Sequence, residues 1–146
     1  MPDTDPILEL LRAARTIAVV GLSAQEDRPS HEVAAYLQAQ GYRIIPINPM
    51  YAGTHILGEH CYATLTQAAK VVAPEVGKID IVDCFRRSDQ VGPIVDEAIA
   101  VGAVAVWMQL GVRNDQAAAK ARAAGLEVVM DHCIKIEHAL RFGTPL

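Results

Sequence analysis

The sequence predicts an α/β fold: a doubly wound parallel sheet of about five main strands in a three-layer α/β/α arrangement. Two observations predict it. Short continuous apolar runs, of which residues 16–21 are the first, have the length and character of strands buried on both faces. The segments between these runs have apolar residues at helical spacing, so the strands should be parallel and joined by right-handed crossovers. The 146 residues correspond to one domain over 1–146.

The elements follow one another without a long linker. A helix is expected within residues 1–15, packing on the domain and starting at Asp5, because proline at position 6 is tolerated in a first turn. The strands are expected at residues 16–21, 43–48, 79–85, 103–108 and 127–130. The other helices are expected at residues 30–40, 64–72, 88–101, 114–124 and 134–140, with Thr64, Ser88 and Asn114 as caps.

Two local features qualify this pattern. Pro46 lies inside the second expected strand and has no N–H to donate, which indicates a strand end or an edge strand. Residues 49–63 contain Gly53 and Gly58 and are expected to be mostly loop, with room for one short strand.

Composition excludes several classes of protein. No apolar run approaches the roughly 20 residues that span a bilayer, and the acidic start MPDTDPILELLRAAR lacks the positive region of a signal peptide. A net charge of −4 and 5% aromatic residues argue against a nucleic-acid partner. Cys61, Cys84 and Cys133 lack CxxC spacing and are expected to be reduced thiols. We therefore expect a cytoplasmic protein without a membrane partner.

The loop after the first expected strand has the residues of a phosphate site. Gly21 would let a ligand approach the backbone, and the amides of the following helix, from Ser30 onward, can hold a phosphate. Ser23 and Ser30 supply hydroxyl groups, and Arg28 supplies a charge suited to phosphate oxygens. The alternative is an ordinary strand-to-helix turn that Ser30 caps.

The second loop argues against an ordinary NAD site. The GxGxxG fingerprint is absent because Ser23 occupies its second glycine position. After the second strand, where an NAD site needs Asp or Glu for the ribose hydroxyls, the chain has Asn48 followed by Pro49. Asn48 can hydrogen-bond a nucleotide, although Asn-Pro is also a common turn opening.

The third and fourth loops add further candidates. Phe85 could pack against a base or a pantetheine chain, while Arg86 and Arg87 concentrate positive charge beside a helix start. A solvated charged turn is the alternative. In the fourth loop Gln109 and Gly111 are placed for ligand contact, whereas the tryptophan two residues before Gln109 is expected in the core.

Metal and catalytic sites are not indicated. His55, His60 and Cys61 lie in one loop, but they lack the spacing of a structural zinc site. Asp80 and Asp83 share a strand with no evident partner, so no Ser-His-Asp triad or carboxylate pair can be assembled. We expect neither a metal nor a catalytic residue.

Five separated segments, VVGLSAQEDRPSHEVAAYL, IPINP, DIVDCFRR, VWMQLGV and VVMDHCIKIEH, together resemble the small stand-alone coenzyme A-binding proteins. They are also similar to the CoA-binding domain of the succinyl-CoA synthetase alpha subunit and of ADP-forming acyl-CoA synthetases. The resemblance covers residues 16–138 and implies a Rossmann-like sheet with CoA across the carboxyl ends of its strands. His132 and His138 lie in no matching phosphohistidine motif, so the synthetase activity is not implied.

The resemblance also implies roles for individual positions. Cys133 falls where the synthetases have a cysteine near the thiol end of the cofactor, and a mixed disulfide with CoA would be chemically reasonable there. The implied cofactor-binding residues are Gly21, Ser23, Arg28, Ser30, Asn48, Pro49, Phe85, Arg86, Gln109, Gly111 and Cys133.

We therefore expect a protein that binds coenzyme A or a short acyl-CoA without its own catalytic centre, as a ligand store or as an accessory module for an acyl-CoA enzyme. Two alternatives belong to another class: a small enzyme of acyl-CoA metabolism and an NAD(P)-binding oxidoreductase. A third is a redox sensor acting through Cys133. The sequence leaves the oligomeric state open.

Overall fold

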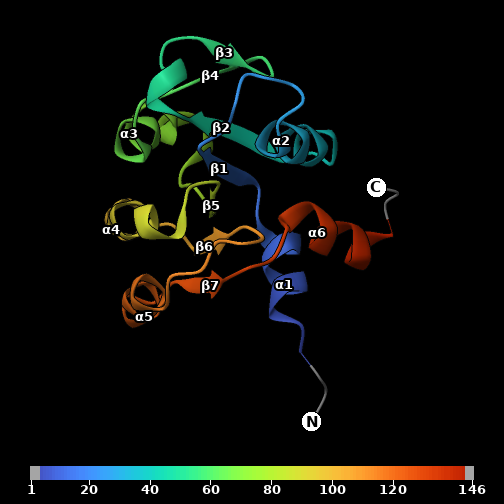
Figure 1. Cartoon of the computed structure of the whole chain (residues 1–146), viewed down its shortest axis with the longest axis vertical. Helices are drawn as coiled ribbons and strands as arrows, with labels where there is room; N and C mark the ends of the chain where they lie inside the picture. Colours follow the sequence, from blue (N-terminus) through green and yellow to red (C-terminus); the bar gives the residue numbers. More distant parts are fainter. Residues whose placement is uncertain (1–3, 144–146) are drawn as a thin grey trace.

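The computed structural model describes residues 4–143; positions 1–3 and 144–146 of the expected 1–146 domain lie outside the described residues. The expected three-layer α/β/α architecture is confirmed (Figure 1). A five-stranded parallel sheet has the order β2-β1-β5-β6-β7. Its strands are β1 (Thr16–Val20), β2 (Arg43–Ile47), β5 (Ile81–Cys84), β6 (Ala105–Met108) and β7 (Glu127–Val129).

Helices cover both faces of this sheet (Figure 1). On one face lie α3 (Leu65–Val76), α4 (Val91–Ala100) and α5 (Asp115–Ala123); on the other lie α1 (Pro6–Ala13), α2 (Pro29–Ala39) and α6 (Ile134–Phe142). Each layer has its own apolar core. Successive side chains of a strand point to opposite faces of the sheet and so contribute to both cores. Val106 packs with α3, α4 and α5, whereas Trp107 packs in the core of α1, α2 and α6. No described helix is long and apolar enough to cross a membrane.

Local capping explains three helix starts as expected. The side chains of Asp5, Thr64 and Asn114 accept hydrogen bonds from the amides of residues three positions ahead, which satisfies donors left over at a helix start. The expected cap at Ser88 is wrong. Residues 88–90 form a short 3-10 helix, and α4 begins only at Val91. The Ser88 hydroxyl instead accepts the amide of Arg113, 2.9 Å away, in the loop before α5.

The edge of the sheet at β2 is covered by the segment that follows it. Residues 49–63 contain a short 3-10 helix (Pro49–Tyr51) and a small hairpin of β3 (His55–Ile56) and β4 (Glu59–His60), where one short strand at most was expected. Tyr62 bridges to Ile47 on β2. Pro46 lies on this edge strand, as its missing N–H predicts.

Candidate functional site

The carboxyl ends of β1, β2 and β5 meet at one point of the sheet. The chain leaves β1 toward α2 on one face and leaves β5 toward α4 on the other, so the switch point of the topology lies between these two strands. The strand ends are joined directly: the Phe85 amide donates to the Val20 carbonyl and the Gly21 amide donates to the Ile47 carbonyl, both at 2.8 Å. In open α/β sheets, ligands bind beyond the strand ends at such a point.

Gly21 makes this convergence sterically feasible. Its φ of +93° lies in the left-handed region, and a Cβ at this position would lie 2.4 Å from the carbonyl oxygen of Phe85. The same Cβ would lie 3.4 Å from Nε of Arg86. Only glycine therefore lets the turn after β1 pass this close to the end of β5.

The loop between Gly21 and α2 is organised by its own side chains. The amide of Ser23 donates to Oγ of Ser30, and the amide of Gln25 donates to Oγ of Ser23, both at 3.0 Å. Nε of Arg28 donates to Oε1 of Gln25 at 3.0 Å. The two serine hydroxyls are thus already acceptors within the loop, which holds the loop in a fixed shape beside the strand ends.

The start of α2 offers fewer free amides than the sequence suggested. Pro29 has no N–H, and the amides of His31 and Glu32 donate back to the Arg28 carbonyl at 3.0 and 3.1 Å. The Ser30 amide has no acceptor among residues 4–143. An anion at this helix start would therefore meet one free amide close to the Arg28 side chain.

Six of the residues singled out from the sequence line one hollow of about 530 Å³: Gly21, Ser23, Arg28, Ser30, Asn48 and Phe85. Gln25, Met50 and Tyr51 also line it, and none of the three was selected from the sequence. For Tyr51 the available signal was an aromatic residue three positions after Asn48, in the loop that follows a buried strand. The hollow combines a basic rim with aromatic and apolar walls.

Pro49 and Arg86 line an adjoining hollow of about 430 Å³. Val20, Ile47 and Ile94, from two strands and α4, are among its apolar lining residues, and the carboxylates of Asp89 and Glu97 line it as well. Pro49 follows Asn48 directly, and Arg86 follows Phe85. The two hollows therefore lie beside the point where β2 and β5 end. Six of the residues predicted from the sequence line the first hollow, and two line the second.

Positive charge at this junction is not neutralised. Arg86 is half-buried, and among residues 4–143 no carboxylate lies within ion-pair distance of Arg28 or Arg86. The nearest polar partner of Arg86 is Oδ1 of Asn48, 3.5 Å from Nη2. Arg87 differs, since it is exposed and pairs with Asp89 at 3.4 Å. Of the three arginines that the sequence grouped together, two retain free charge at the site.

Asn48 is built into the fold. It is only 8% exposed. Its Nδ2 donates to the Leu22 carbonyl at 3.0 Å, and its Oδ1 accepts the Met50 amide at 3.0 Å. The side chain therefore ties the end of β2 to the loop after β1, in addition to its contact with Arg86.

Three residues implied by the resemblance lie in neither hollow. Gln109 is 4% exposed, and its Oε1 accepts the amide of Ile134 at 3.1 Å, at the start of α6. The Gly111 amide donates to Oδ1 of Asp131 at 2.7 Å. Cys133 is half-buried and immediately precedes α6. They form a second group, at the ends of β6 and β7.

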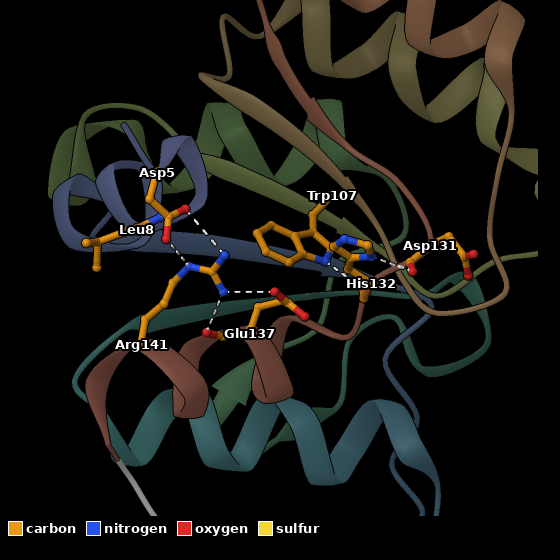
Figure 2. Close-up of polar contacts among 7 residues, drawn as sticks. All are labelled: Asp5, Leu8, Trp107, Asp131, His132, Glu137 and Arg141. Atoms are coloured by element: carbon orange, nitrogen blue, oxygen red, sulfur yellow. Dashed lines mark hydrogen bonds and ion pairs between the residues drawn. The ribbon is translucent and has the colours of Figure 1, made fainter. Parts of the chain in front are cut away.

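Trp107 belongs to this second group as a support. It is fully buried, as expected of a core residue, and its Nε1 donates to the His132 carbonyl at 2.8 Å (Figure 2). This bond and the one from Gln109 hold the segment between β7 and α6 against the end of β6.

Two other titratable side chains, Asp83 and Cys84, are buried in the core. Both carboxyl oxygens of Asp83 are buried without a partner in the described structure, and burial raises the pKa of this carboxyl well above its usual range. Burial likewise raises the pKa of the Cys84 thiol. Cys61 is buried whereas His55 and His60 are exposed, with ring centroids 5.6 Å apart across the hairpin. Residues 4–143 contain no group of three His, Cys, Asp or Glu residues suited to a metal ion.

The fold and the strand-end site define a Rossmann-like α/β domain. A family model described as CoA binding domain matches residues 15–139, and the chain belongs to this family. An uncharacterized protein of Bacillus subtilis, YneT, is 38% identical over 139 residues, which cover 95% of this chain and 96% of YneT. A CoA-binding role in general is therefore supported.

Solved structures agree with this placement. A hypothetical protein from Pyrococcus horikoshii has a TM-score of 0.84 at 33% identity, covering 98% of this chain and 100% of that one. The cell-free ID.343 protein from Thermus thermophilus has a TM-score of 0.82 at 33% identity, covering 93% and 96% of the two chains. Both resemble this chain over nearly their whole length.

Proposed function

We propose that this protein binds coenzyme A, or a short acyl-CoA, across the carboxyl ends of β1, β2 and β5, and that it acts as a binding or accessory protein. One observation carries the proposal: within residues 4–143, Arg28 and Arg86 have no ion-pair partner, and both lie near the tight turn at Gly21 where the topology switches. A ligand with several phosphates supplies the anions that these guanidinium groups lack.

The residues present fit such a ligand. At Gly21 the missing Cβ lets the turn after β1 pack against the Phe85 carbonyl, which places this turn beside Arg86. Arg28, the Ser30 amide and Arg86 would hold phosphate oxygens. The rings of Tyr51 and Phe85 in the wall of the first hollow would pack against flat or apolar parts of the ligand.

The two hollows differ in their titratable side chains. The lining of the first, within the described residues, includes no histidine and no carboxylate, whereas Asp89 and Glu97 line the adjoining hollow that contains Arg86. The hydroxyls of Ser23 and Ser30 accept backbone amides, and no general base lies beside them in the lining of the first hollow. A partner enzyme of acyl-CoA metabolism and a cytoplasmic location remain predictions from the sequence.

Calorimetric titration of the full chain with CoA, acetyl-CoA, NAD and NADP tests the proposal. We expect saturable binding of CoA and acetyl-CoA and no heat of binding with either dinucleotide. Binding of NAD or NADP in preference to CoA would contradict the proposal, because the site would then recognise the ribose despite the missing acid after β2.

A further inference from the structure

We propose that Asn48 determines the ligand specificity of this site: it is a neutral partner that positions Arg86 and leaves the positive charge of Arg86 for a phosphate of the ligand. This inference rests on the proposed function, and it adds how the site distinguishes a phosphate-rich ligand from a dinucleotide. Asn48 acts here through Arg86 and is a positioning residue.

The orientation of the Asn48 amide is fixed from both sides. Nδ2 must face the Leu22 carbonyl, which only accepts, and Oδ1 must face the Met50 amide, which only donates. The oxygen is thereby directed toward Nη2 of Arg86, 3.5 Å away. Because the side chain is 8% exposed, water cannot easily replace these contacts.

Arg86 is confined on its other side by the turn after β1. Its Nε lies 3.4 Å from the point where a Cβ of Gly21 would be, so the guanidinium packs beside this turn. Other arginines of the described chain pair with carboxylates: Arg43 with Glu59, Arg113 with Asp115 and Arg141 with Asp5. Arg86 has an amide oxygen in the place of that carboxylate.

The side chain at position 48 therefore sets the charge of the junction. A carboxylate at this position would form a charge-assisted pair with Arg86 and neutralise it. The neutral amide directs the guanidinium without neutralising it. A phosphate of the ligand, either in the pyrophosphate or as the 3′-phosphomonoester of CoA, can then pair with Arg86, because the carboxylates of Asp89 and Glu97 in the same hollow form no described ion pair with it.

The same amide disfavours a dinucleotide. A ribose diol is bound in NAD sites by a carboxylate that accepts both hydroxyl protons. Oδ1 of Asn48 already accepts the Met50 amide and faces Arg86. It therefore offers little acceptor capacity to a diol, and selection by the site depends on phosphate.

The test is a double-mutant cycle on the full chain, with dissociation constants for CoA and 3′-dephospho-CoA measured by calorimetry at two salt concentrations. We expect Asn48→Asp to weaken CoA binding about 30-fold, the loss expected when a charge-assisted bond to phosphate is removed. In an Arg86→Gln background the same substitution should change the affinity less than about threefold. Equal losses in both backgrounds would overturn the inference, because a merely structural role of Asn48 does not depend on Arg86.

Aspartate lacks the donor that the Leu22 carbonyl receives, so thermal unfolding must show that Asn48→Asp is folded. A second comparison does not need this variant. Arg86→Gln should weaken CoA binding and reduce its salt dependence, whereas Arg87→Gln, which removes a charge already paired with Asp89, should change neither. Unchanged salt dependence in Arg86→Gln would overturn the inference.

Comparing CoA with dephospho-CoA identifies which phosphate Arg86 binds. If dephospho-CoA loses as much affinity as CoA in Arg86→Gln, the phosphate at Arg86 belongs to the pyrophosphate; if only CoA loses affinity, it is the 3′-phosphomonoester. Either result supports the role of Asn48. Absence of CoA binding by the unmodified protein would refute the proposed function itself, whereas CoA binding that is indifferent to both residues would refute only this inference.

Discussion

Two junctions of the molecule use arginine in opposite ways. At the α1–α6 junction, Arg141 is 19% exposed and pairs with Asp5 at 2.9 Å and Glu137 at 2.8 Å (Figure 2). At the carboxyl ends of the strands, Arg86 is half-buried and meets only the amide oxygen of Asn48 among the described residues. One guanidinium is fully compensated, while the other retains its charge.

The two arginines are expected to serve different purposes: Arg141 stabilises the fold, whereas Arg86 is available to bind a ligand. Removing charge from water costs free energy unless an opposite charge replaces the lost hydration, which the two carboxylates do for Arg141. Arg86 bears part of this cost without compensation from the described protein, which is a common feature of ligand sites. Substitutions at the α1–α6 junction should therefore lower the stability, and substitutions of Arg86 should mainly lower the ligand affinity.

The largest effect on stability is expected at Gly21, where there is no room for a Cβ. Gly21→Ala adds a Cβ 2.4 Å from the Phe85 carbonyl oxygen, at a φ that L-residues avoid. We expect a loss of about 3 kcal/mol in the free energy of unfolding, measured with urea. Gly53→Ala is the matched control, because its φ is +87° but a Cβ there would meet nothing within 4 Å. Equal losses would show that the close approach to β5 contributes nothing.

Arg86→Ala should weaken CoA binding by about 2 kcal/mol, the worth of a charge-assisted hydrogen bond. The melting temperature should change little, because no described ion pair is broken. Arg87→Ala, whose charge faces Asp89 at the exposed surface, serves as the comparison and should leave the affinity unchanged. If the two variants bind CoA equally well, Arg86 does not belong to the site.

The buried carboxyl of Asp83 should lower the stability of the fold, because no described partner and no ligand compensates it. Asp83→Val should raise the free energy of unfolding by about 1.5 kcal/mol at pH 7, since both carboxyl oxygens lack partners within residues 4–143. Asp80→Val is the contrast: its carboxylate accepts the amides of Arg15 and Thr16 at 2.8 and 3.0 Å, so its loss should destabilise. A destabilised Asp83→Val would contradict the absence of a partner.

The pH dependence gives a second measurement on Asp83. Because burial raises the pKa of this carboxyl, the unfolded chain releases its proton near pH 4 and the folded chain does so only at higher pH. The free energy of unfolding should therefore fall as the pH rises above about 4. Asp83→Asn should remove this decline. Burial of His138 lowers the pKa of that ring and acts in the opposite direction, but it is common to both proteins.

The smallest effect is expected for the compensated arginine. Arg141→Gln should lower the melting temperature by about 2 °C near neutral pH, since the pairs are only partly screened by water. Arg141 holds the pKa of Asp5 below its ordinary value, so this contribution is present above the ordinary carboxyl pKa and is lost as the pH falls through the lowered one. CoA affinity should not change. A loss of affinity in Arg141→Gln would remove the distinction between the two junctions.

Much of the fold could be predicted because it depends on local signals. Asp5, Thr64 and Asn114 cap their helices through amides three residues ahead, which a sequence shows directly. Ser88 has the same residue type as a good cap, but its hydroxyl is taken by Arg113, 25 positions further along the chain. Local preference was overridden there by a long-range contact.

In the candidate site, too, the sequence predicted the residues but not all of their contacts. A glycine after a buried strand pointed to Gly21, but the 2.4 Å approach to Phe85 arises from the pairing of β1 with β5. Asn48 and Gln109 were expected to face a ligand because both follow strands. Their side chains hold the Leu22 carbonyl and the Ile134 amide, contacts that depend on how distant loops pack, and Asn48 also lines the first hollow.

The sequence alone determined the alternation of strands and helices and the edge position of Pro46, because apolar periodicity, local capping and a missing N–H are local signals. The family resemblance came from separate sequence segments. The tertiary structure decided which charges remain free. Arg86 and Arg141 look alike in the sequence. Asp5 lies 136 positions before Arg141 and only folding brings it within 2.9 Å, whereas folding brings Arg86 to an amide. Which arginines are compensated depends on long-range packing, so the sequence could place the candidate site in the strand-end loops but could not show which of its charges stay unpaired.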